Sequence, residues 1–178
     1  MSHLYRRLPA IACAFVIAGL TAPAQNAPEA PNVAGIFYST SAGWQRLYEA
    51  PADGMTPTGC WFEPCGSHTD FRYIYNGPRS PIQLAERQPS FYVNIGLRPD
   101  RHLQQIQVVR LRVRKGYREA RYSWDIDTMR GGLTDVTPVT AEYTPTGALM
   151  VRPIVALEPG QYVLSLGPIA AKYDFEIQ

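Results

Sequence analysis

The stretch that decides the fold is DRHLQQIQVVRLRVRK, residues 100–115, the longest segment of the chain without proline or glycine. It is the only serious candidate for a helix. In its second half apolar and basic side chains alternate, with Val109, Leu111 and Val113 set against Arg110, Arg112 and Arg114. A period of two indicates a strand, because no helical face of period 3.6 passes through the apolar positions without including arginines. We expect one strand over residues 106–114, with one face in the core, and a hairpin turn at Lys115-Gly116.

The rest of the chain has the same character. Short β-branched and aromatic runs alternate with turn residues, and the 178 residues include 16 prolines and 14 glycines. This pattern predicts an all-β fold, a single mainly antiparallel β-sandwich of about 8–10 short strands. A closed barrel is the alternative. The expected strands cover residues 35–39, 44–49, 71–75, 81–84, 91–95, 106–114, 118–123, 148–152, 161–166 and 173–177.

The N-terminus is typical of an export signal. A basic pair, Arg6-Arg7, precedes an apolar run that is too short to span a membrane, and Ala22-Pro23-Ala24 offers small residues for cleavage before Gln25. We expect a signal peptide at 1–24, a disordered tether at 25–32 and a sandwich domain at 33–178. The mature protein is then periplasmic or extracellular, and no later stretch is long and apolar enough for a membrane span.

Charge argues against a nucleic-acid partner. The chain has 17 Lys+Arg and 15 Asp+Glu, and the loss of Arg6 and Arg7 with the signal leaves 15 of each. A nucleic-acid-binding domain normally carries a clear excess of basic residues. The partner we expect is an unknown protein or a glycan.

Cys60 and Cys65 lie in the segment GCWFEPCG, residues 59–66. Two cysteines in an exported chain predict a disulfide, and the flanking glycines with Pro64 favour a tight turn. Metal binding with His68 and Asp70 is the alternative, as are free or intermolecular thiols. Trp61 and Phe62 inside this ring are possible ligand contacts, or they fold back to cap the sandwich.

The alternating segment raises one further hypothesis. Arg110, Arg112 and Arg114 could face an anion, because guanidinium groups suit carboxylates and phosphates. The alternative is a solvated sheet face that discourages edge-to-edge pairing.

Near the C-terminus, the segment LEPGQYVL, residues 157–164, combines a Pro-Gly turn with an alternating strand. It resembles the turn-and-strand segment of immunoglobulin-like and prealbumin-like sandwich modules of bacterial secreted proteins. The resemblance covers about ten residues, supports a sandwich and implies no activity.

No catalytic motif occurs in the sequence, which also contains no phosphate loop, dinucleotide fingerprint or metal motif of the common kinds. We therefore expect a non-catalytic binding or structural module without a cofactor, metal site or catalytic residues. The alternatives are a small periplasmic hydrolase with dispersed residues, for which His68 and His102 are the only histidines outside the signal, and a carbohydrate-binding module.

Overall fold

The chain forms three β-sheets, and the described residues contain no helix. The computed structural model describes residues 29–50, 52–57, 68–96, 106–125, 127–128, 130–167 and 172–178. The prediction of an all-β, mainly antiparallel, sandwich-like fold is confirmed. The strands are more numerous than expected and form three sheets.

Sheet A has the strand order β12-β13-β6-β1-β2, with all neighbours antiparallel. Its strands are β1 (Gly35–Thr40), β2 (Gly43–Leu47), β6 (Phe91–Asn94), β12 (Val139–Tyr143) and β13 (Leu149–Pro153). Sheet B has the order β10-β9-β4-β3, and one further strand, β8, also pairs with β9. Its strands are β3 (Gly54–Pro57), β4 (His68–Asn76), β8 (Arg112–Arg114), β9 (Tyr117–Asp125) and β10 (Arg130–Leu133).

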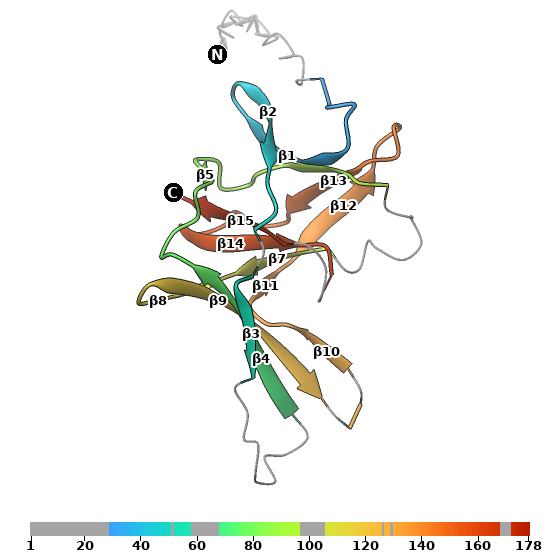
Figure 1. Ribbon diagram of the computed structural model, residues 1–178. Coiled ribbons are helices and arrows are strands. Elements are labelled where there is room, and N and C mark those ends of the chain that lie inside the picture. Colours follow the sequence, from blue (N-terminus) through green and yellow to red (C-terminus); the bar gives the residue numbers. More distant parts are fainter. Residues whose placement is uncertain are drawn as a thin grey trace, which may run out of the picture.

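Sheet C lies between the other two and has the order β11-β7-β14-β15-β5. Its strands are β5 (Gln83–Leu84), β7 (Gln107–Arg110), β11 (Val136–Thr137), β14 (Gly160–Ser165) and β15 (Lys172–Ile177). The pairing of β15 with β5 is parallel, whereas the other pairs are antiparallel. Figure 1 shows β14, β15 and β7 at mid-height, with β1, β2, β12 and β13 above them and β3, β4, β9 and β10 below.

Both faces of sheet C are buried, which makes it the middle layer of the molecule. On β14, Tyr162 and Leu164 belong to the core shared with sheet A, whereas Val163 belongs to the core shared with sheet B. On β7, Val108 and Val109 divide in the same way. This explains why residues 162–164 are all apolar, since a strand covered on both sides has no solvent-facing side that requires polar residues.

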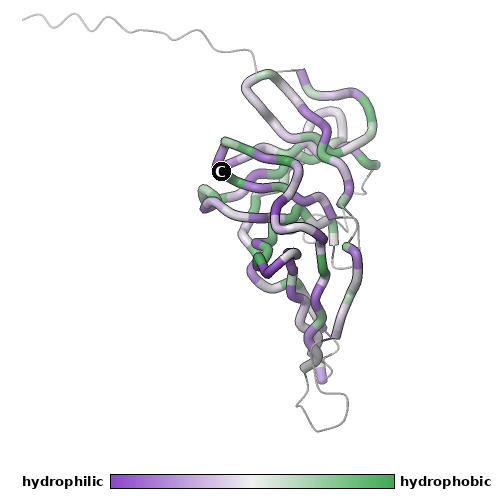
Figure 2. Tube along the Cα trace, turned by 60° about the vertical axis from the view of Figure 1, so that its left-hand side comes forward, coloured by the Kyte–Doolittle hydropathy of each residue, from purple (hydrophilic) through white to green (hydrophobic). Residues whose placement is uncertain are grey.

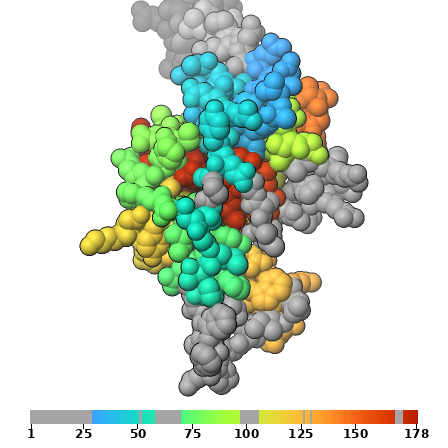
Figure 3. All heavy atoms as spheres, in the orientation of Figure 1, coloured from blue at the N-terminus to red at the C-terminus, as the bar shows by residue number. Residues whose placement is uncertain are grey.

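The expected single strand over residues 106–114 is divided between two sheets. Its first part is β7 of sheet C and its last part is β8 of sheet B, and the chain crosses at Leu111, whose N–H donates to the Gln161 carbonyl at 2.8 Å. The hairpin at Lys115-Gly116 is present, with Gly116 at φ +87°, and in the space-filling view the β8–β9 hairpin, in yellow, protrudes from the side of the molecule (Figure 3). Val113, expected on the core face, is 53% exposed, because β8 has left the sandwich.

Sheet B extends beyond the layer that it packs on. Tyr75, Tyr73 and Ala120 contribute to the core with sheet C, whereas Phe71 and Trp124, further along the same strands, do not. Figures 1 and 2 show this end of the sheet projecting from the body as a narrow extension. The projecting part therefore exposes a sheet face that elsewhere is covered.

A buried ion pair joins sheet B to sheet C. Arg118 of β9 pairs with Asp174 of β15, and both side chains are almost completely buried. The remaining donors of this guanidinium reach the carbonyls of Gly77 and Asn76 at 3.1 and 3.0 Å. Such a pair is tolerated in the interior only when its hydrogen-bonding capacity is used, as it is here.

Candidate functional site

Aromatic side chains gather on the projecting face of sheet B. We define the aromatic surface as Met55, Phe71, Tyr73, Tyr122 and Trp124, which line a shallow hollow of about 390 Å³. The strand register explains the grouping, because Met55 lies opposite Tyr73 and Phe71 lies opposite Tyr122. Residues two apart on a strand point to the same face, so Tyr122 and Trp124 also share it.

The rings of the aromatic surface form a connected set. Tyr122 is at its centre, with its centroid 6.4 Å from Phe71, 6.4 Å from Tyr73 and 6.5 Å from Trp124. Tyr122 and Trp124 are nearly parallel, with an interplanar angle of 18°, while Tyr73 meets Tyr122 edge-on at 84°. The two nearly parallel rings provide a platform on which a flat apolar face can stack.

A glycine on the neighbouring strand makes room for this platform. Gly131 of β10 lies opposite Trp124, and a Cβ atom built on it would stand 2.5 Å from Oη of Tyr122 and 2.6 Å from Cε3 of Trp124. Both rings therefore lie across the backbone of β10 and cover it. Any larger residue at this position would push the rings apart.

The inner end of the aromatic surface meets sheet C. There the Nζ atom of Lys172 lies 3.7 Å from the centroid of the Tyr73 ring, a cation–π geometry. Burial lowers the pKa of Lys172. Burial, reinforced by Tyr122, raises the pKa of Tyr73, so its hydroxyl stays protonated at neutral pH.

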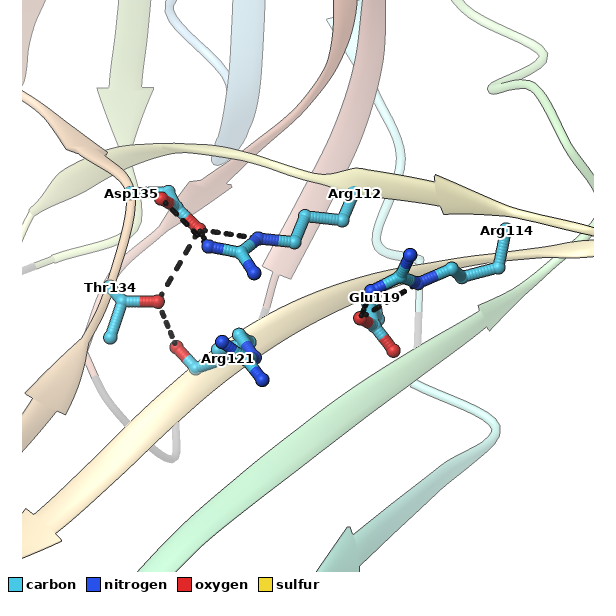
Figure 4. A network of polar contacts seen from close by, with 6 residues as sticks. All are labelled: Arg112, Arg114, Glu119, Arg121, Thr134 and Asp135. Atoms are coloured by element: carbon cyan, nitrogen blue, oxygen red, sulfur yellow. Dashed lines mark hydrogen bonds and ion pairs between the residues drawn. The ribbon is translucent and has the colours of Figure 1, made fainter. Parts of the chain in front are cut away.

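The opposite face of sheet B carries arginines arranged around a carboxylate. Glu119 is fully buried, and its Oε1 atom accepts hydrogen bonds from Nε and Nη2 of Arg114, each at 3.1 Å (Figure 4). Its Oε2 atom lies 3.6 Å from Nη1 of Arg72, which the register places directly opposite Arg121. Two arginines in adjacent positions repel each other, and the carboxylate next to them reduces that repulsion.

The three arginines that the sequence places in one row do not form one surface. Arg110 belongs to sheet C and pairs with Glu158 at 2.5 Å, whereas Arg112 and Arg114 belong to sheet B. Arg112 donates from Nε to Asp135 at 3.1 Å, as Figure 4 shows. Each guanidinium already has a carboxylate of its own chain, so an external anion would have to compete with it.

Other residues singled out in the sequence lie outside the described residues. These are Cys60, Cys65, Trp61, Phe62 and His102, together with the signal segment 1–24 and the first part of the tether. His68 begins β4. Among the residues that the structure describes, no group of three or more His, Cys, Asp or Glu side chains could hold a metal ion.

A larger hollow, of about 730 Å³, lies between the β1–β2 hairpin and the segment around β5. Two pairs of its polar groups are joined by hydrogen bonds: the Tyr38 hydroxyl donates to Gln45 at 2.6 Å, and the Ser39 hydroxyl to Glu86 at 3.4 Å. The aromatic surface differs because three of its rings, those of Phe71, Tyr122 and Trp124, are only half-buried and lie at an open face.

Comparison of the chain with protein-family models, with curated proteins and with solved structures returned no match. Within the described ranges, no helix is long and apolar enough to cross a membrane. The site must therefore be interpreted from its own chemistry.

Proposed function

We propose that the protein is an exported, non-catalytic binding module that holds a carbohydrate on the aromatic surface of sheet B. The observation that carries the proposal is the nearly parallel pair Tyr122 and Trp124, placed on a sheet face that projects beyond its covering layer. The C–H faces of a pyranose ring are apolar and flat, and they stack on aromatic rings, while the sugar hydroxyls remain available to water and polar side chains.

Several features of the aromatic surface support this assignment. The hollow is shallow and built on paired strands, so the platform is positioned before the ligand arrives. Aromatic side chains have few rotatable bonds and lose little entropy on binding. The hydroxyl of Tyr122 adds a polar group beside the rings, which a ligand rich in hydroxyls can use.

The test is binding to a panel of soluble polysaccharides, measured by affinity electrophoresis and then by calorimetry. We expect Trp124→Ala to weaken the best ligand about tenfold, the loss of roughly 1.4 kcal/mol of stacking energy. Trp44→Ala is the matched control, since Trp44 packs against Tyr92 on sheet A, with centroids 5.7 Å apart, and should leave binding unchanged.

Two results would count against the proposal. One is the absence of binding to every glycan of the panel by a protein with a cooperative thermal transition. The other is an equal loss of affinity in Trp124→Ala and Trp44→Ala, which would indicate a general loss of structure rather than the loss of a contact.

A further inference from the structure

A second cleft lies where all three sheets come close to one another, away from the aromatic surface. It has a volume of about 470 Å³ and is formed by the chain after β2, the end of β4, the segment before β5, β9 and β15. Its apolar wall includes Tyr48, Ala50, Pro81 and Ile82. The ligand inferred below for this cleft does not depend on the carbohydrate-binding function proposed above.

The cleft coincides with a gap in the hydrogen bonding along the outer edge of β15. Ala50 N–H donates to the Lys172 carbonyl at 2.8 Å, and Glu176 N–H donates to the Ile82 carbonyl at 2.8 Å. Alternate residues of an antiparallel strand direct their backbone groups to the same edge, so the N–H and C=O of Asp174 also face outwards between these two contacts. No backbone group of the described residues pairs with this edge at Asp174.

Next to this gap lies a buried hydroxyl without a partner. Tyr75 lines the cleft and is only 2% exposed, yet its Oη atom makes no hydrogen bond within the described part of the chain. Burial, with a further contribution from Asp174, raises the pKa of Tyr75 far above its usual value, so the group remains a hydroxyl at any physiological pH. A buried hydroxyl without a partner is unfavourable, and a polar group of a ligand that reached it would remove that cost.

The charges around the cleft select the kind of ligand. Glu49, Asp53 and Asp174 provide three carboxylates, whereas Arg118 provides the one guanidinium among the lining residues that the structure describes. That guanidinium is already occupied by Asp174 and by two backbone carbonyls. The lining residues therefore carry a net negative charge beside an apolar wall, and this combination suits an organic cation with an aliphatic stem.

We propose that this cleft binds an alkylammonium ligand, with its charged nitrogen near Glu49, Asp53 and the Asp174 carbonyl, and with its aliphatic stem against Ala50, Pro81 and Ile82. The Tyr75 hydroxyl, buried at the wall of this cleft, would gain a partner if a polar group of the same ligand reached it. A lysine side chain of a peptide and a free aliphatic diamine both have this chemistry.

The experiment is titration of the folded protein with three probes of similar length, followed by two-dimensional NMR. The probes are 1,5-diaminopentane, N-acetyl-lysine methylamide and the neutral 1,5-pentanediol. We expect shifts of the resonances around Asp174 with the two ammonium probes, weakened by added salt, and none with the diol. Tighter binding of the lysine derivative than of the diamine would point to a peptide as the source.

Variants distinguish binding in the cleft from a general effect of the protein's charge. We expect Glu49→Gln to weaken the ammonium probes about threefold, whereas Glu142→Gln, which removes the same charge from an exposed position of β12, leaves binding unchanged. Tyr75→Phe should reduce affinity without loss of stability, because it deletes a hydroxyl that has no partner among the described residues. Binding of the diol as tight as that of the diamine, no shifts with any probe, or equal effects of Glu49→Gln and Glu142→Gln would overturn the proposal.

Discussion

At the scale of single residues, the ion pairs of this protein differ in how deeply they are buried. Arg118 and Asp174 form a pair inside the molecule, while Arg112 and Asp135 form a pair of similar type at the surface, where the side chains are 42% and 37% exposed. A charge left alone in the interior loses its hydration without compensation, whereas one left alone at the surface is solvated by water. Loss of one partner should therefore destabilise the fold more for the buried pair than for the exposed pair.

This contrast gives a direct test. We expect Arg118→Ala to lower the free energy of unfolding by about 3–5 kcal/mol, because Asp174 would remain buried without a partner. Arg112→Ala should cost about 1 kcal/mol or less. Urea denaturation of the two variants measures both values, and similar losses would show that the junction of sheets B and C is more hydrated than its burial indicates.

A second prediction at this scale concerns acid. Hydrogen bonds from Arg79 to Glu176, at 2.9 and 3.1 Å from Nε, lower the pKa of Glu176 below the ordinary value of 4.5. A carboxyl with a lower pKa in the folded state stabilises the fold above the unfolded pKa and loses that contribution as pH falls through the folded pKa.

We therefore expect Glu176→Gln to be less stable than the native protein at neutral pH, with a difference that shrinks once the pH falls below about 4.5. Thermal melting at a series of pH values measures it. A difference that stays constant down to about pH 2 would mean that the ion pair does not contribute to the acid sensitivity of the fold.

At the scale of elements, the alternating segment has different environments at its two ends. Val109 of β7 is completely buried between sheets C and B, whereas Val113 of β8 is 53% exposed. We expect Val109→Ala to cost about 2 kcal/mol of stability and Val113→Ala less than about 0.5 kcal/mol. Denaturant titration distinguishes this from a single strand with one buried face, for which the two losses would be alike.

The neighbouring glycines of β10 provide a second pair of variants. We expect Gly131→Ala to displace the rings of Tyr122 and Trp124, to change the near-UV circular dichroism and to cost about 1–3 kcal/mol. Gly132→Ala should have little effect, because a Cβ there meets no atom within 4 Å. If both variants keep the native spectrum, the platform is not held over Gly131 as described.

The ten strands expected from the sequence all coincide with strands of the structure, because alternation and turn residues act locally. Four further strands carry weak signals or none. Gly54–Pro57 and Arg130–Leu133 contain residues that disfavour strands, and Pro138 divides Val136–Thr137 from Val139–Tyr143. Pairing within the sheets overrides these local preferences, since β3, β10 and β12 each pair with a strand next to them in the chain and β11 pairs with the more distant β7. β7 separates from β8 because β7 pairs with the distant strand β14, whereas β8 pairs with β9 across the hairpin turn.

The aromatic surface had a signal in the sequence that was too general to use. Phe71 and Tyr73, like Tyr122 and Trp124, are spaced two apart, but aromatic residues are common on strands whatever they face. What brings them to an open face is that sheet B continues past sheet C, and this depends on the relative lengths of two packed sheets. No pattern within one strand contains that information.

At the scale of the whole molecule, one layer serves two cores. Because β14 presents Tyr162 and Leu164 to sheet A and Val163 to sheet B, loss of sheet C exposes both cores at once. The three sheets should therefore unfold together, although sheet B projects from the body.

Tryptophans in two sheets allow this to be tested. Trp44 reports on sheet A and Trp124 on sheet B, so fluorescence of Trp44→Phe and Trp124→Phe emphasises opposite ends of the molecule. We expect a single transition in each variant, with midpoints that agree after correction for the stability change of the substitution. Two separated transitions would show that sheet B is an independent unit.

The position of β15 in the chain has a consequence for the order of events during synthesis. This strand, Lys172–Ile177, is made after every other described strand, yet it lies between β14 and β5 and contributes Phe175 and Asp174 to opposite faces of the middle layer. A nascent chain that still lacks it has neither core complete, however much of the chain has left the ribosome. Closure of both cores therefore waits for β15, and until this strand has been made the three sheets cannot pack together as they do in the finished fold.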